Sequence, residues 1–358
     1  MSNHTERVAI LGGTGLVGRR LASLLINHPS FELAMVIGSD SSAGMSYRQV
    51  WAQKERALRN HYGEFWREDP FPPQLDTVQV SNLDQLLRSD CSLIFSTVHE
   101  RYGYLEEQLR KDGRTIFSNS PYKRFHDDVA LIVPEVNGEI LHGKRFIKYP
   151  NCVSSGLVLV LAPLKQHYGL REVVITTYQS LSGRGDAKYP AHLVVGNVYP
   201  LHASPEATEE YIRKELCAVL RTSCPTSACC NRVYTQEGHL VEVGVKTERR
   251  IDRVEDVRDI LASFDPLRSY ELHSSFTPPL FLVTESGRPR PAQDSQHSKG
   301  MAVAVGNLSI DDEIFDLRLT YVINNLIRGA AGGILLCAEL WKHQKKTEAV
   351  NATACVGG

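Results

Sequence analysis

Three glycines close to the N-terminus, Gly12, Gly15 and Gly18, constrain the fold of this chain more than any other sequence feature. They lie between an apolar run at 8–11 and a stretch at 21–26 whose apolar residues have helical spacing. Such a turn needs an unusual backbone conformation, a close approach of N–H groups to a pyrophosphate, and a tight contact between helix and strand, so side chains are excluded. Because a second apolar run follows the helix, the pattern predicts a βαβ unit that binds a dinucleotide.

Asp40 follows that second apolar run. A carboxylate about 20 residues past the glycine turn accepts hydrogen bonds from an adenosine ribose in many dinucleotide sites. A solvated loop carboxylate is an equally good interpretation of the sequence.

The charge balance favours a small-molecule partner. Forty Lys and Arg against 41 Asp and Glu give a net charge of -1, which provides no field that would hold nucleic acid or anionic lipid. The longest apolar run, 157–164, is far shorter than the roughly 20 residues of a membrane span. The first residues have neither a basic region nor a small-residue cleavage site, so we expect a cytoplasmic protein with no membrane partner and no nucleic-acid partner.

The cysteines predict reduced thiols and one nucleophile. Eight in 358 residues are too sparse for a disulfide framework, and Cys224, Cys229 and Cys230 lack the spacing of a zinc site, so no metal is predicted. Cys152 stands where a proline-bearing turn enters an apolar, helix-like stretch, PNCVSSG. The helix N-terminus would lower the thiol pKa, and its N–H groups would hold an oxyanion; a small buried side chain is the alternative. Beside a dinucleotide, a thiolate indicates hydride transfer involving a thioester, with an acid/base residue that the 13 histidines leave unidentified.

A family resemblance extends this reading of the residues. Eight segments carry it: GGTGLVG, SNSPYKRFHDDVALIVPEVN, YPNCVSSG, YQSLSGRGD, CCNRVYTQEGH, GRPRP, KGMAVAVGN and NNLIRGAAG. In order and spacing they resemble aspartate-β-semialdehyde dehydrogenases of the archaeal and fungal branch, over residues 7–342. N-acetylglutamyl-phosphate reductases share the chemistry but usually have glycine where Asn151 stands, so the resemblance to them is weaker.

The resemblance implies roles for the matching positions. Cys152 would be the nucleophile, Asn151 would shape its turn, and His239 would be the acid/base residue. The implied substrate-binding residues are Gln179 for the acyl group, Arg232 for the carboxylate, Asn119 and Arg124 in a phosphate-facing loop, and Glu209. The implied cofactor-binding residues are Gly12, Thr14, Gly15, Leu16, Val17, Gly18, Ser39, Ser41, Ser42, Ser182, Gly183 and Asn325, the last of these at the nicotinamide carboxamide.

Several of these residues also have structural interpretations. Arg124 and Arg232 have an alternative interpretation as surface charges. Gln179 has one as a polar residue at a strand end, and Asn325 as a helix cap. A guanidinium nevertheless suits a carboxylate, because its planar fork makes two charge-assisted hydrogen bonds. The aligned context favours the functional interpretation.

Two departures from the family pattern bear on cofactor and substrate. Ser41 and Met45 stand where the family usually has an arginine and a lysine for the ribose 2′-phosphate, so we expect NADP with relaxed or reversed selectivity that admits NAD. Tyr211 stands where the family has a lysine near the substrate phosphate. Lys214, through a register shift, or Lys123 would be the replacement cation.

The fold class implied is α/β, with a doubly wound Rossmann nucleotide-binding domain and an inserted α/β catalytic and dimerisation domain. We expect the first at 1–150 plus 324–345, the second at 151–323, and a disordered tail at 346–358. The implied enzyme is a homodimer or homotetramer that reduces β-aspartyl phosphate to aspartate semialdehyde and phosphate through a Cys152 thioester. A specialised paralogue acting on a related acyl or aldehyde substrate, and a non-catalytic dinucleotide sensor, are the alternatives.

Overall fold

The first half of the chain forms a parallel sheet that is open at both edges. The structure, a computed structural model, describes residues 5–184, 191–202, 207–310 and 313–356. Seven strands pair in the order β3-β2-β1-β4-β5-β7-β6, all in parallel. Their bounds are β1 Glu6–Leu11, β2 Phe31–Ile37, β3 Val80–Ser81, β4 Leu93–Ser96, β5 Thr115–Ser118, β6 Ala130–Leu131 and β7 Phe146–Lys148.

The strand order of this sheet reverses between β1 and β4. In open α/β sheets, ligands bind beyond the carboxyl ends of the strands at such a switch point, and the glycine turn follows β1 there. The βαβ prediction is confirmed, and the first helix ends at Leu24, before Pro29, where a helix could not have continued without disruption. The helices of this half are α1 Leu16–Leu24, α2 Tyr47–Tyr62, α3 Leu83–Leu87, α4 Tyr104–Lys111 and α5 Pro134–Asn137.

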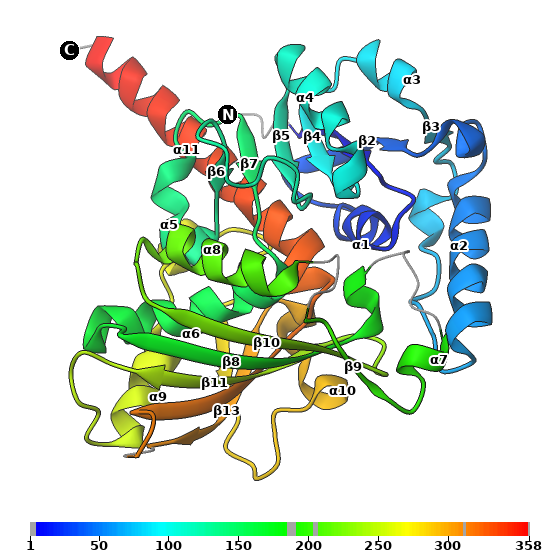
Figure 1. Ribbon diagram of the computed structural model, residues 1–358. Helices are drawn as coiled ribbons and strands as arrows, with labels where there is room; N and C mark the ends of the chain where they lie inside the picture. The colour runs from blue at the N-terminus through cyan, green and yellow to red at the C-terminus, as the bar shows by residue number, and fades with distance from the viewer. Residues whose placement is uncertain (1–4, 185–190, 203–206, 311–312, 357–358) are drawn as a thin grey trace.

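A second, mixed sheet occupies the other half of the molecule (Figure 1). Its order is β12-β13-β14-β11-β8-β10-β9, with β8–β10 and β12–β13 parallel and the other pairs antiparallel. The strands are β8 Glu172–Gln179, β9 Val198–Pro200, β10 Thr226–Val233, β11 His239–Lys246, β12 Leu280–Leu282, β13 Val303–Ser309 and β14 Leu317–Ile323. The helices are α6 Cys152–Tyr168, α7 Ala191–Val194, α8 Thr208–Leu220, α9 Val254–Ser263 and α10 Pro291–Asp294.

The second sheet is covered on one face by helices α6, α8 and α9. Along β8 the side chains alternate accordingly: Val173 and Ile175 are buried, whereas Val174 is 38% exposed. On the opposite face, side chains such as Val174 therefore stay partly exposed to solvent among the described residues.

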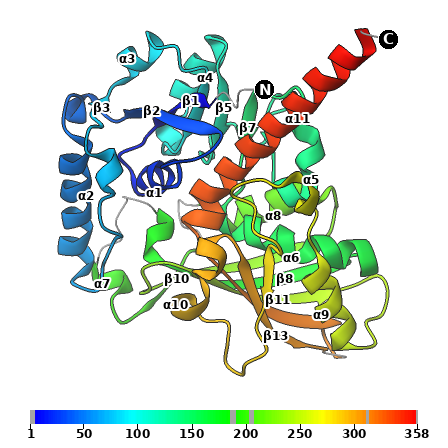
Figure 2. The ribbon, with the colours of Figure 1, turned by 180° about the vertical axis from the view of Figure 1, so that it is seen from behind.

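The chain returns to the first sheet at its end. A π-helical turn, η8 Ile327–Ala331, leads into α11 Gly332–Val356, which runs back across the first half of the molecule (Figure 2). Leu335, Leu336 and Cys337 are fully buried, and Trp341 packs edge-on against Phe117 of β5 at 5.7 Å between ring centroids. The C-terminal helix thus packs with the nucleotide-binding sheet.

Helix α11 also corrects the predicted disordered tail, because helical backbone continues to Val356. Lysine, glutamate and alanine, which are good helix formers, fill four of the five positions 345–349, and Glu348 pairs with His142 at 2.5 Å. The domain boundaries at 150 and 324 stay a prediction: the strands of the first sheet end at Lys148, and those of the second lie between Glu172 and Ile323. Across the described ranges, no helix has both the length and the apolar character that spanning a membrane requires.

Candidate active site

The glycine turn has the shape that a pyrophosphate needs. Gly12 has φ +80°, in the left-handed region that disfavours side chains, and a Cβ on Gly18 would lie 2.5 Å from the Gly12 oxygen. Helix α1 begins directly after Gly15 with no side-chain cap, so the N–H groups of its first turn remain for a phosphate. The Tyr47 hydroxyl donates to the Gly13 oxygen at 2.7 Å and braces the turn. These residues fit a dinucleotide.

Three serine hydroxyls gather beside this turn, after β2. Ser39 Oγ lies 2.9 Å from Ser41 Oγ and 3.3 Å from Ser42 Oγ. A Cβ on Gly38 would touch both Ser42 and Thr14, so the serine loop and the glycine turn are neighbours. Asp40, in the same loop, is exposed.

The candidate nucleophile and acid/base residue meet between the two sheets. Cys152 is the first residue of α6, and Asn151 caps that helix by accepting from the Val153 N–H at 2.9 Å. His239 opens β11 and is fully buried. Its Nε2 lies 3.2 Å from the Cys152 sulfur, although 86 residues separate the two in the chain. The structure therefore brings this predicted pair into direct contact.

The electrostatics of this pair correct one expectation. Helix α6 was expected to lower the Cys152 pKa, but the atoms packed around the sulfur raise the pKa to about 11, and the charge of Arg232 and the Val153 N–H offset only part of that rise. Burial, with the nearby Arg232 charge, holds the pKa of His239 well below 6.5. A neutral thiol beside a neutral imidazole is therefore the resting state at neutral pH.

A buried cation lies next to the pair. Arg232 and Gln179 face each other across the parallel strands β10 and β8, and both are at most 2% exposed. A Cβ on Gly183 would come within 2.9 Å of the Arg232 guanidinium and the His239 ring, so only glycine lets these groups approach each other here. Gln179 Nε2 donates to Thr177 Oγ1 at 3.0 Å.

Asn325 links the C-terminal segment to this centre. Its Oδ1 accepts from the Gly238 N–H at 2.9 Å and lies 3.0 Å from the Ser180 hydroxyl as a second acceptor position, and its Nδ2 donates to Ser182 Oγ at 2.9 Å. Three of the four hydrogen-bonding positions of this amide are thus used within the protein, which leaves one N–H for a ligand.

The predicted phosphate-facing loop is joined to the Cys152 turn through a buried carboxylate. Glu215 of α8 accepts from Arg124 Nη1 at 2.6 Å with one oxygen and from the Asn151 N–H at 3.0 Å with the other. Asn119 has a side-chain amide whose nitrogen and oxygen are both buried without a hydrogen-bond partner. An unsatisfied buried amide is costly, so Asn119 is suited to receive a polar ligand.

The remaining charged candidates are engaged elsewhere. Lys214 pairs with Glu210 at 2.5 Å, and Lys123 pairs with Glu107 at 3.2 Å. Tyr211 lies beside Arg124, whose guanidinium carbon is 5.6 Å from the Tyr211 ring centroid. Neither lysine is therefore available as a replacement cation without breaking an ion pair.

Glu209 lies against the same strand as Arg232. Its Oε1 accepts from the Cys230 N–H of β10 at 3.0 Å, and its Oε2 lies 3.2 Å from Nδ1 of His202. The Glu209 carboxylate therefore lies at Cys230 of β10, two residues before Arg232, which supplies the guanidinium.

Sequence reasoning missed three residues that build the site: Ser180, Glu215 and Gly329. A Cβ on Gly329 would lie 2.5 Å from the Cys152 Cβ, so this glycine of the π-helical turn lets the nucleophile pack against it. Gly329 stood within a motif that carried the resemblance, and that was its only signal. Ser180 likewise stood within the motif YQSLSGRGD, whereas Glu215 carries no local signal at all.

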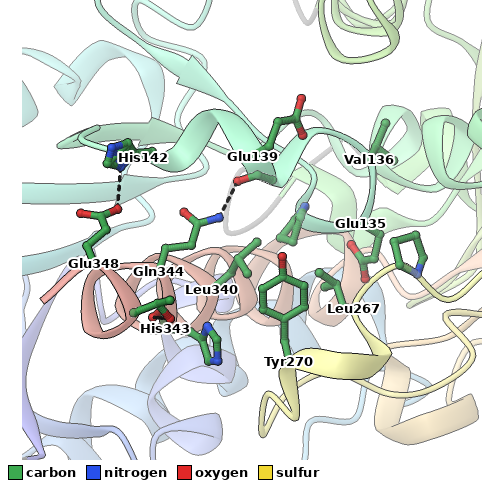
Figure 3. A pocket seen from close by; sticks show the side chains of 14 residues that line it. Glu135, Val136, Glu139, His142, Leu267, Tyr270, Leu340, His343, Gln344 and Glu348 are labelled. Carbon is green, nitrogen blue, oxygen red and sulfur yellow. Dashed lines mark hydrogen bonds and ion pairs between the residues drawn. The ribbon is translucent and has the colours of Figure 1, made fainter. Parts of the chain in front are cut away.

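A pocket whose lining side chains are shown in Figure 3 lies away from this centre. It has a volume of about 610 Å³ and is lined by α11 and by residues such as Glu135, Tyr270 and His343. None of the predicted site residues lines it. Among the described residues, no group of three or more His, Cys, Asp or Glu could hold a metal ion.

Comparisons with known proteins identify the family to which this chain belongs. Two family models match: Semialdehyde dehydrogenase, NAD binding domain, over residues 7–143, and Semialdehyde dehydrogenase, dimerisation domain, over residues 161–328. The aspartate-semialdehyde dehydrogenase of Methanothermobacter thermautotrophicus is 30% identical and aligns with 93% of this chain and 98% of its own length. The malonyl CoA reductase (NADP) of Metallosphaera sedula is 31% identical, with 94% and 96% covered.

A solved structure is similar over nearly the whole chain. Aspartate semialdehyde dehydrogenase with NADP from Candida albicans has a TM-score of 0.80 and 26% identity, and the match covers 96% of this chain and 99% of that chain.

Proposed function

Because the chain belongs to the semialdehyde dehydrogenase family of NAD(P)-dependent oxidoreductases, we propose that it reduces β-aspartyl phosphate reversibly to aspartate semialdehyde and phosphate. The observation that carries this proposal is the 3.2 Å contact between the Cys152 sulfur and Nε2 of His239, beside the buried Arg232 guanidinium. A thiol, an imidazole and a guanidinium at one point are the groups that covalent reduction of an acidic acyl substrate requires.

Cys152 performs the covalent step. His239 takes the thiol proton, the sulfur attacks the acyl carbon, the carbon–oxygen bond to the phosphate breaks, and the phosphate leaves with the electron pair. When bound, the nicotinamide supplies the hydride that reduces the thioester. The thiohemiacetal then collapses to the aldehyde, and His239 moves the proton between its oxygen and the sulfur. Arg232 and the Val153 N–H stabilise the thiolate against the opposing effect of burial.

The remaining side chains recognise the substrate. Arg232 binds the α-carboxylate and Glu209 binds the α-ammonium group, because Glu209 of α8 contacts Cys230 of β10, two residues before Arg232, and the two side chains have opposite charges. Gln179, opposite Arg232, orients the acyl group. Asn119 offers its unpartnered amide to the phosphate, near the Arg124 guanidinium.

The turn at Gly12–Gly18 holds the cofactor pyrophosphate, and the hydroxyls of Ser39, Ser41 and Ser42 face the adenosine ribose. The family's arginine and lysine are absent at Ser41 and Met45, so a 2′-phosphate gains hydrogen bonds there without charge. Each missing charge-assisted contact is worth about 1.5–3 kcal/mol, which supports use of both NADP and NAD.

The assembly is a homodimer or a homotetramer through the open face of the second sheet. The match to a dimerisation domain over residues 161–328 supports this, since it covers that sheet. The seven cysteines described, all free, are consistent with a reducing cytoplasm.

A second candidate reaction is reduction of an acyl thioester of coenzyme A. It is favoured by the 31% identity to a malonyl CoA reductase and by Tyr211, which stands where the phosphate-binding lysine was expected. Such a substrate reaches the same Cys152 thioester without an acyl phosphate.

Absorbance at 340 nm tests both reactions. With aspartate semialdehyde, phosphate and NADP or NAD, we expect phosphate-dependent formation of reduced cofactor. A larger kcat/KM for malonyl-CoA and NADPH would assign the second reaction instead. Tight nucleotide binding with no absorbance change in any pairing would leave only a dinucleotide sensor.

A further inference from the structure

Ser180 is the residue on which the polar groups of this site converge. It follows β8, is fully buried, and none of the reasoning from sequence singled it out. Its backbone oxygen accepts from Arg232 Nη1 at 2.8 Å, its backbone N–H donates to Nδ1 of His239 at 3.1 Å, and its hydroxyl lies 3.1 Å from the same Nδ1.

The backbone contact fixes the tautomer of His239. A peptide N–H can only donate, so Nδ1 must accept and carries no hydrogen in the neutral ring. The ring proton is therefore on Nε2, which faces the Cys152 sulfur at 3.2 Å. The thiol in turn donates to Asn151 Oδ1 at 3.8 Å, so the resting arrangement is internally consistent.

This tautomer is a donor at Nε2 and cannot take up a proton there. A proton shuttle at Nε2 needs either the other tautomer or the imidazolium ion, and in both of these Nδ1 carries a hydrogen. The peptide N–H of Ser180 cannot accept that hydrogen. Among the described residues, the Ser180 hydroxyl is the oxygen that lies within hydrogen-bond distance of Nδ1.

We propose that the Ser180 hydroxyl is a two-way hydrogen-bond switch that positions His239 for proton transfer. With Nδ1 unprotonated, the hydroxyl donates to Nδ1. With Nδ1 protonated, it accepts from Nδ1 and turns its own hydrogen to Asn325 Oδ1, 3.0 Å away. Ser180 neither gains nor loses a proton, so only the direction of two hydrogen bonds changes.

The surroundings explain why this acceptor matters. The charged and titratable groups facing His239 are Cys152 from α6 and Arg232 from β10, and neither supplies a negative charge at neutral pH. Burial and the Arg232 cation both disfavour a protonated ring. Asn325 is held by the Gly238 N–H and Ser182, so its oxygen is a fixed second acceptor for the Ser180 hydrogen.

The kinetic consequence rests on the proposed function, whereas the tautomer of His239 rests on the hydrogen bonds around Ser180 alone. Ser180→Ala removes the acceptor for a protonated Nδ1 and keeps the peptide N–H. We therefore expect kcat to fall about tenfold or more, and the kinetic pKa of His239 to fall by about one pH unit, with nucleotide affinity unchanged. Ser180→Thr, which retains a hydroxyl, should restore both.

Ser154→Ala is the matched control, because its hydroxyl is buried without a hydrogen-bond partner in the adjacent helix. It should leave the pH profile of kcat where it is in the unmodified protein. A Ser180→Ala protein whose kcat and pH profile equal those of Ser154→Ala would overturn the switch.

A spectroscopic readout keeps the test independent of turnover. In ¹⁵N spectra of histidine-labelled protein, with His239→Asn identifying the signals, His239 should carry its proton on Nε2 near neutral pH. A ring protonated at Nδ1 would overturn the inference even if the enzyme is active. The expected spectrum in a protein without turnover would uphold the hydrogen-bond arrangement while rejecting the proposed reaction.

Discussion

Adding one methyl group at Gly329 should displace the nucleophile. The new Cβ would lie 2.5 Å from the Cys152 Cβ and 3.0 Å from its Cα, where ordinary contact begins near 3.4 Å, so the shortest distance must open by about 0.9 Å. Neither side yields easily, because the Gly329 N–H donates to Asn324 at 2.9 Å and Cys152 is held by its helix cap. Overpacking of this size costs about 1–3 kcal/mol of stability.

The catalytic effect of Gly329→Ala should exceed its effect on stability. A misplacement of about 1 Å in a reacting group lowers the rate by about 10²-fold, so we expect kcat to fall by that factor while the dissociation constant of the nucleotide stays unchanged. Initial rates at 340 nm and calorimetric nucleotide titration measure the two quantities. Ala330→Gly, in the same π-helical turn, loosens the backbone without adding atoms and should retain most of the rate. A folded Gly329→Ala protein with a kcat within twofold of the unmodified protein would refute the reasoning.

Three further predictions follow from the site. Cys152→Ser should abolish turnover and leave nucleotide affinity near its original value; a retained rate would reject the covalent route. Because burial raises the pKa of Cys152 to about 11, its alkylation by iodoacetamide without ligands should speed up about tenfold per pH unit between neutral pH and 11, and a plateau near neutral pH would contradict this. Ser41→Arg combined with Met45→Lys should raise the ratio of kcat/KM for NADP over NAD by about tenfold or more, whereas an unchanged ratio would place the 2′-phosphate elsewhere.

Sequence patterns predicted the structural features that depend only on residues adjacent in the sequence. The apolar run at 8–11 lies within β1, Glu6–Leu11, and the start of α6 at Cys152 follows from the proline-bearing turn before it. These features arise from periodicity and from backbone restrictions of proline and glycine, which act over a few residues.

Contacts between distant segments could not be predicted in the same way. Glu215 serves Arg124 and Asn151 from 91 and 64 residues away, and nothing in TEEYIRKELC distinguishes it from Glu209 or Glu210. The predicted direction of the Cys152 pKa shift was wrong for a related reason. A helix N-terminus is visible in sequence, but the enclosure of the sulfur by His239, Gly329 and their neighbours exists only in three dimensions.

The central claim is that Cys152 carries the substrate as a covalent acyl group. Mixing the protein with aspartate semialdehyde and NADP in the absence of phosphate tests it most directly, because the thioester then has no phosphate acceptor. We predict a burst of one reduced cofactor per subunit, together with an aspartyl mass increment confined to the peptide that contains Cys152. A burst without any adduct on that peptide, or an adduct on another cysteine, would contradict the account.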